Sequence, residues 1–129
     1  MNVIVPDGHL LPELIEFPPL AARKFSWLQF LGLDRQELTD RCWRMHCVVT
    51  LNTPLDAELL NSMGNLELLI VANHDLSLID VQAAEKNNVT VCQVPDLDPA
   101  QFDINNPEQA QQLCNTVVKL IDHYEQQLL

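Results

Sequence analysis

Residues 46–94 read HCVVTLNTPLDAELLNSMGNLELLIVANHDLSLIDVQAAEKNNVTVCQV and alternate short apolar runs with helical patterns. The apolar runs cover residues 46–51, 66–72 and 89–94, and they are rich in the aliphatic and β-branched residues typical of buried strands. Strands that alternate with helices predict a mainly parallel sheet with helices on both faces.

The segments between these strands carry residues that start and end helices. Thr53, followed by a proline and by Asp56, predicts a helix with the threonine as its N-cap, and Gly64 can end this helix. Ser77 and Asp80 predict the start of a second short helix, which ends just before two asparagines.

Further elements are predicted on both sides of this central stretch. Residues 3–5 and 25–30 read as strands, and Asp34 with Glu37 predicts a capping box at the start of a helix. Residues 107–129 predict a long final helix with an apolar stripe broader than a coiled-coil seam. The element order therefore predicts a single α/β domain over residues 1–129.

Composition limits the function classes. The chain has 129 residues, of which 47% are hydrophobic, and a net charge of −11. Residues 1–44 hold five bases and six acids, whereas residues 45–129 hold two bases and twelve acids. Such a surface repels phosphate backbones and anionic lipid, so we expect neither a nucleic acid nor a membrane partner. The acidic part is interpreted either as a solvated face or as a face for a basic partner.

The cysteines and the chain start indicate the compartment. Cys42, Cys47, Cys92 and Cys114 form no CxxC motif and are predicted on two helices and two strands, as buried thiols of a reducing compartment usually are. The first residues show no charged n-region, and no apolar stretch has the length of a membrane span. We therefore expect a cytoplasmic protein.

Glycine spacing argues against a bound nucleotide. Gly8, Gly32 and Gly64 are isolated from one another, so neither a dinucleotide fingerprint nor a P-loop can be written in this sequence. We expect no cofactor on the chain alone. No His, Cys and Asp residues stand at metal-ligand spacing, and we expect no metal.

The stretch 41–95 resembles the substrate-binding (catalytic) domain of D-isomer-specific 2-hydroxyacid dehydrogenases, and most of all the glycerate dehydrogenase and hydroxypyruvate reductase group. The matching pieces are a strand followed by Asn-Thr-Pro-Leu-Asp at 52–56, the strand 68–72, Ile-Asp at 79–80, and Val-Cys-Gln-Val-Pro at 91–95. The resemblance implies a flavodoxin-like, three-layer domain whose five strands have the order 2-1-3-4-5. It also implies that the 107–129 helix corresponds to the segment that crosses into the family's coenzyme domain.

The resemblance further implies a site at the carboxyl ends of the strands, where strand order reverses. The candidate ligand-binding residues at this edge are Asn52, Thr53, Asn73, His74, Asp75, Leu76 and Ser77. In the family, a glycine in the loop after the fourth strand lets backbone N–H groups hold the substrate carboxylate. Asp75 stands about where that glycine is expected, and we expect it to repel an anion and to resist the glycine conformation.

The family's coenzyme domain and its catalytic Arg, acid and His lie beyond the segment that these residues match, so no catalytic residue is assigned. The leading hypothesis is a stand-alone, non-catalytic relative of the substrate domain that binds a small ligand, such as a small carboxylate, or a protein. One alternative is a fragment or split subunit of an NAD-dependent 2-hydroxyacid dehydrogenase that acts with a separate coenzyme domain. Another is a structural dimer subunit without ligand. We also expect a homodimer through the 107–129 helix, with Trp43 or Leu128–Leu129 adding to an apolar patch.

Overall fold

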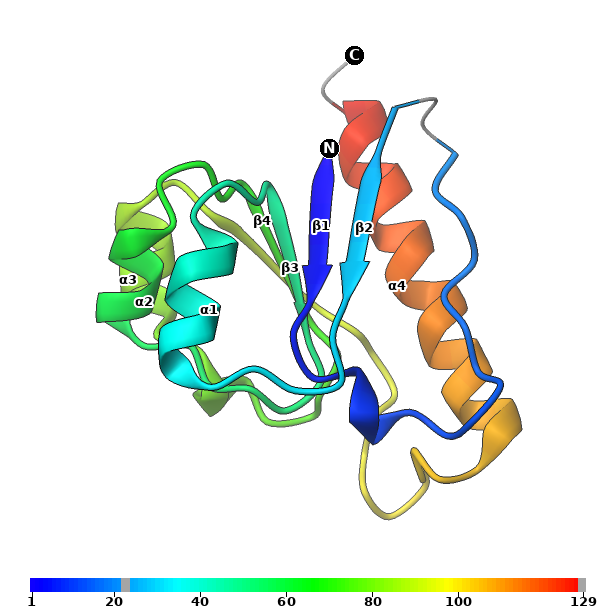
Figure 1. Ribbon diagram of the computed structural model, residues 1–129. Helices are drawn as coiled ribbons and strands as arrows, with labels where there is room; N and C mark the ends of the chain where they lie inside the picture. Colours follow the sequence, from blue (N-terminus) through cyan, green and yellow to red (C-terminus); the bar gives the residue numbers. More distant parts are fainter. Residues whose placement is uncertain (22–23, 128–129) are drawn as a thin grey trace.

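A parallel sheet forms the centre of the molecule. The computed structural model describes residues 1–21 and 24–127, and within them five strands pair in the order β2-β1-β3-β4-β5, every pair being parallel (Figure 1). The predicted α/β fold and strand order are confirmed. The strands are β1 (Asn2–Val5), β2 (Ser26–Gln29), β3 (Cys47–Thr50), β4 (Leu68–Val71) and β5 (Thr90–Gln93).

Three short helices cover one face of the sheet (Figure 1). They are α1 (Arg35–Cys42), α2 (Ala57–Ser62) and α3 (Val81–Lys86). The capping box predicted at Asp34 and Glu37 is present, with the Glu37 N–H donating to the Asp34 carboxylate at 2.8 Å. Alternate residues of the central strands, such as Ile4, Val48 and Leu69, pack against these helices and are fully buried. Alternation along each strand thus supplies an apolar surface to both layers.

The long helix α4 (Pro107–Gln127) covers the opposite face (Figure 1). The segment that follows the 3-10 helix η1 (Gly8–Leu10) runs beside α4 and is tied to it by hydrogen bonds. The Gln111 amide donates to the Glu16 carbonyl, and the Asp122 carboxylate accepts the Ala21 N–H. Most of the predicted apolar stripe is buried against the sheet: Ala110, Leu113, Cys114, Val117, Val118 and Ile121.

The C-terminal end of the apolar stripe of α4 is less covered than the rest of it. Tyr124 is half-buried, and Leu128 and Leu129 lie outside the described residues. Trp43, the other residue expected in the patch, is half exposed at the end of α1. Among the described residues, the exposed large hydrophobic side chains lie outside α4. A homodimer through this helix stays a prediction, with little apolar surface on the described turns to support it.

Two helix boundaries differ from the sequence prediction. Helix α2 begins at Ala57 with Asp56 as its N-cap, because the Asp56 carboxylate accepts the Leu59 N–H at 3.0 Å. Thr53 does not cap this helix and lies in the loop that follows β3. At the other end Met63 is the C-cap, and no glycine of the described chain has a positive φ, so Gly64 supplies no left-handed stop.

The second short helix is also shorter than predicted. Asp80 is the N-cap of α3, as expected, whereas Ser77 lies in a separate 3-10 turn, η2 (Leu76–Leu78). Asn88, just past α3, takes the left-handed conformation with φ 58°, which confirms the expected ending. In the described part of the chain, no helix combines the length and the apolar character that a bilayer crossing requires.

Candidate functional site

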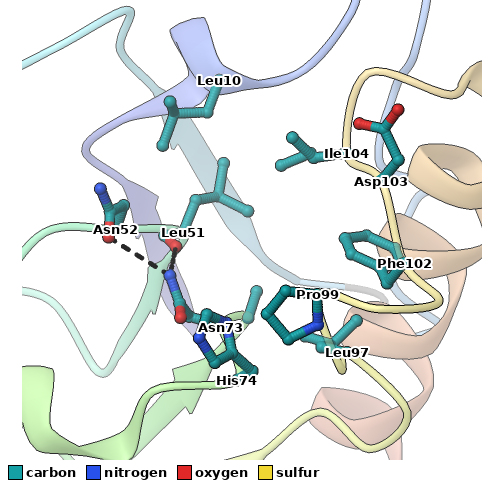
Figure 2. Close-up of a pocket in the computed structure, with 11 residues that line it drawn as sticks. Leu10, Leu51, Asn52, Asn73, His74, Leu97, Pro99, Phe102, Asp103 and Ile104 are labelled. Atoms are coloured by element: carbon teal, nitrogen blue, oxygen red, sulfur yellow. Dashed lines mark hydrogen bonds between the residues drawn. The ribbon is translucent and has the colours of Figure 1, made fainter.

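A pocket of about 350 Å³ lies at the carboxyl ends of β3 and β4, the edge at which ligands gather in such sheets (Figure 2). One wall comes from the residues that end these strands, and the facing wall comes from the loop between β5 and α4. The lining residues are Leu10, Leu51, Asn52, Ala72, Asn73, His74, Leu97, Pro99, Phe102, Asp103 and Ile104. Its volume is within the range of small-molecule sites, and apolar side chains dominate its walls.

The structure brings three of the seven predicted site residues to this pocket. Asn52, Asn73 and His74 line it. The other four, Thr53, Asp75, Leu76 and Ser77, lie beside it and take part in the turns that shape its rim.

The Asn73 side chain joins the two strand ends that form the pocket floor. Its Nδ2 donates to the Leu51 carbonyl at 2.8 Å and to Asn52 Oδ1 at 3.3 Å, as Figure 2 shows. Its Oδ1 accepts the Asp75 N–H at 2.9 Å. The Gln93 amide, from β5, donates to the carbonyls of Asn73 and His74 at 2.9 and 3.0 Å. The amides of three neighbouring strand ends therefore hold this edge in one arrangement.

Asp7 is a further organising residue, which the sequence analysis treated only as part of a turn. Its carboxylate follows β1, is 5% exposed, and accepts the N–H groups of Leu51 and Asn52 at 3.1 and 2.6 Å. It also accepts the Thr53 hydroxyl at 2.8 Å. The only sequence signal was an acidic residue two positions after a β-branched run. Asp7 fixes the loop that carries Asn52 into the pocket.

The loop at residues 97–104 forms the facing wall, and the sequence analysis did not assign it to the site. Two turns built on Asp98 and Asp103 shape this loop. Asp98 accepts the Ala100 N–H at 2.9 Å, and the Asp103 N–H donates to the Gln109 side chain on α4. Leu97 is buried, whereas Phe102 is half-buried and faces the strand ends (Figure 2). The apolar residues spaced through this acidic loop are the sequence signal that could have identified it as a wall of the site.

Asp75 adopts an ordinary extended backbone conformation, with φ −96°, rather than one that only glycine adopts readily, which agrees with the expectation that it resists the glycine conformation. Its carboxylate caps η2 by accepting the N–H of Ser77 at 3.0 Å. Hydrogen bonds from the Ser77 hydroxyl and backbone hold the pKa of the Asp75 carboxyl below its usual value. The Ser77 N–H, which could otherwise donate to a bound anion, therefore donates to the Asp75 carboxylate.

The titratable groups of the pocket do not form a catalytic arrangement. His74 and Asp75 are neighbours in sequence, but the hydrogen bonds of the Asp75 carboxylate go to Ser77. Among residues 1–21 and 24–127, no group of three or more His, Cys, Asp or Glu side chains is placed to hold a metal ion. Burial raises the pKa of the Cys42 and Cys114 thiols to about 12, which keeps them protonated and unreactive.

The family is established by comparison of the sequence with family models. The model of the D-isomer specific 2-hydroxyacid dehydrogenase catalytic domain matches residues 16–102, about two thirds of the chain. The chain belongs to this family. No curated protein matches the chain at a significant level.

Solved structures share the fold at low sequence identity. The 3-phosphoglycerate dehydrogenase of Entamoeba histolytica superposes with a TM-score of 0.56 and 14% identity over 74% of this chain and 33% of that one. D-lactate dehydrogenase of Escherichia coli gives 0.58 and 16%, over 77% and 32%. The glyoxylate/hydroxypyruvate reductase of Sinorhizobium meliloti gives 0.52 and 17%, over 74% and 29%. The chain spans about a third of the length of these enzymes.

Proposed function

We propose that these 129 residues act as a small-ligand-binding module derived from the dehydrogenase substrate domain, without hydride-transfer chemistry of their own. The observation that carries the proposal is the pocket of about 350 Å³ at the strand ends, closed by the 97–104 loop. Apolar walls provide affinity, and Asn52 and His74 provide polar contacts that orient a ligand.

Two features support binding rather than catalysis. Hydride transfer needs a bound nicotinamide, and the sequence holds no glycine-rich turn to receive its pyrophosphate. Within residues 1–21 and 24–127, the pocket lining also contains no Arg or Lys that would pair with the carboxylate of a 2-hydroxy acid. We expect no NAD or NADP binding by this chain alone. A micromolar dissociation constant in titration calorimetry would contradict this part of the proposal.

The test of the pocket is a titration of small apolar fragments followed by amide chemical shifts. We expect shifts that saturate and are confined to the strand ends and the 97–104 loop. In the variant Ile104→Trp the indole fills the pocket from its outer wall, so binding should be lost while the fold is kept. Leu31→Trp is the matched control, because Leu31 is 79% exposed and does not line the pocket. Unchanged binding in Ile104→Trp would refute the assignment of the site.

A second candidate function is a split or partial subunit of an NAD-dependent 2-hydroxyacid dehydrogenase. The family match, together with the third of enzyme length that the chain spans, supports this alternative. The quoted motifs favour the glycerate dehydrogenase and hydroxypyruvate reductase group as its origin. A neighbouring reading frame that encodes a glycine-rich coenzyme domain would allow a direct test. NADH oxidation coupled to the reduction of an added 2-oxo acid to its 2-hydroxy acid by the mixture, but by neither part alone, would favour this function over the binding module.

A further inference from the structure

Several carboxylates surround the pocket. Five aspartates lie on the segments that line it or bond directly to them: Asp7, Asp75, Asp96, Asp98 and Asp103. Asp103 is itself a lining residue, and Asp96 and Asp98 flank the lining residue Leu97. These carboxylates come from three separate parts of the chain that only the fold brings together.

Positive charge near these carboxylates is scarce. Among the residues that the structure describes, the pocket lining contains no Arg or Lys, and His74 is its one side chain that can become cationic. His74 stands beside Asp75, whose carboxylate offsets that charge. In the described parts of the chain, the ion pairs between side chains are those of Arg35 with Asp56 and Glu58, away from the pocket walls.

The hydrogen bonds of the aspartates leave their negative charge in place. The acceptor bonds from backbone N–H groups to Asp7, Asp75, Asp98 and Asp103 come from neutral donors. Neutral donors stabilise a carboxylate without cancelling its field at a distance. A ligand in the pocket therefore meets apolar walls within a negative potential.

We propose that the pocket selects a small apolar amine, whose alkyl or aryl body fills the cavity while its ammonium group faces the acidic rim. This inference rests on the proposed binding function and names its ligand class. It differs from the carboxylate expected from family resemblance, because the loop N–H of Ser77 is already occupied by Asp75. Asp103, on the outer wall, is an exposed carboxylate among the lining residues and is available to an ammonium group.

The test compares three probes of similar size and different charge: 2-phenylethylamine, 2-phenylethanol and phenylacetate. Each is titrated into the labelled protein in 20 mM salt, with the amide signals of Asn52, His74 and Ile104 as the readout. We expect the amine to bind about tenfold more tightly than phenylacetate, with the alcohol between them, and 300 mM salt to reduce this ratio. Equal or tighter binding of phenylacetate or of the alcohol would overturn the ligand class and leave the pocket standing. Absence of saturable shifts with all three probes would overturn the binding function itself.

A variant that neutralises one carboxylate tests which residue causes the preference for the amine. Asp103→Asn keeps an oxygen that can accept the Asn105 N–H, so the loop turn should be preserved. It should weaken amine binding about two- to threefold and leave alcohol binding unchanged. Asp40→Asn removes the same charge from α1, on the other face of the sheet, and should change neither. Equal effects of the two substitutions would mean that net charge, rather than the pocket rim, decides the preference, and would refute the proposed role of Asp103.

Discussion

Replacing Asp7 by alanine tests whether one buried carboxylate organises the strand-end edge. The carboxylate accepts three hydrogen bonds from residues 44 to 46 positions further along the chain. In the alanine variant, the N–H groups of Leu51 and Asn52 and the Thr53 hydroxyl lose their acceptor in a place that is largely shielded from water. The loop that positions Asn52 should therefore lose its main attachment to β1.

The magnitude follows from the number and kind of bonds. A hydrogen bond to a charged acceptor contributes about 1.5–3 kcal/mol, and desolvation of the carboxylate offsets part of the sum of three. We expect Asp7→Ala to lower the free energy of unfolding by about 3 kcal/mol. Asp7→Asn keeps one acceptor oxygen and should lower it by about half as much. Thr53→Val removes one of the three bonds and should cost about 1 kcal/mol.

Urea denaturation followed by circular dichroism measures these differences. The control is Asp122→Ala, which removes an exposed carboxylate that accepts one bond, from the Ala21 N–H at 3.0 Å, and should cost about 0.5 kcal/mol. In the double variant, the effect of Thr53→Val should shrink once Asp7 is alanine, because the two groups share a bond. Additive effects, or an Asp7→Ala cost no larger than the control, would refute the organising role of Asp7.

Three further predictions concern the helix, the thiols and the loop. Val118→Glu should unfold the protein because Val118 is 4% exposed, whereas the Tyr124→Glu variant should stay folded. Light scattering of the Tyr124→Glu variant shows whether the expected dimer uses this position. A dimer mass in both the parent protein and this variant would place the interface elsewhere. Cys92 should react first with a thiol reagent at pH 8, because burial raises the pKa of the other three thiols further. Since those protons are held more tightly in the folded state, the contribution of the thiols to the free energy of unfolding should be constant below pH 8 and fall as the pH rises above about 9. An equally fast reaction of all four thiols would contradict the buried arrangement. Asp75→Gly should lower the melting temperature slightly through loss of the cap on η2. It should also increase the thermal shift caused by phenylacetate, because it removes a negative charge and frees the Ser77 N–H. A thermal shift no larger than that of the parent protein would refute this role of Asp75.

Much of the fold could be predicted because its signals are local. The β-branched runs, the capping box at Asp34 and the cap at Asp80 depend on residues within one turn of each other, and each was found where it was predicted. The N-cap of α2 was missed because Thr53 and Asp56 are both good capping residues. The choice between them was made by Asp7, which holds the Thr53 hydroxyl from another strand.

The candidate site was predicted only in part, because it depends on contacts between segments that are far apart in the sequence. Topology places the ends of neighbouring parallel strands at one edge, so Asn52, Asn73 and His74 could be located from the sequence. The position of the 97–104 loop over that edge depends on how α4 packs, and no short-range pattern encodes it.

The sequence by itself determined the strand and helix pattern, the family, the negative charge and the lack of a nucleotide-binding turn. Only the tertiary structure decided that Asp7 anchors the pocket floor, that Asp75 occupies the N–H of Ser77, and that Phe102 and Ile104 close the pocket. The physical reason is the separation along the sequence of the residues whose interactions produce each feature. Strand and helix signals arise between residues a few positions apart, whereas a pocket arises where packing brings distant segments into contact and aligns their hydrogen-bonding groups and charges.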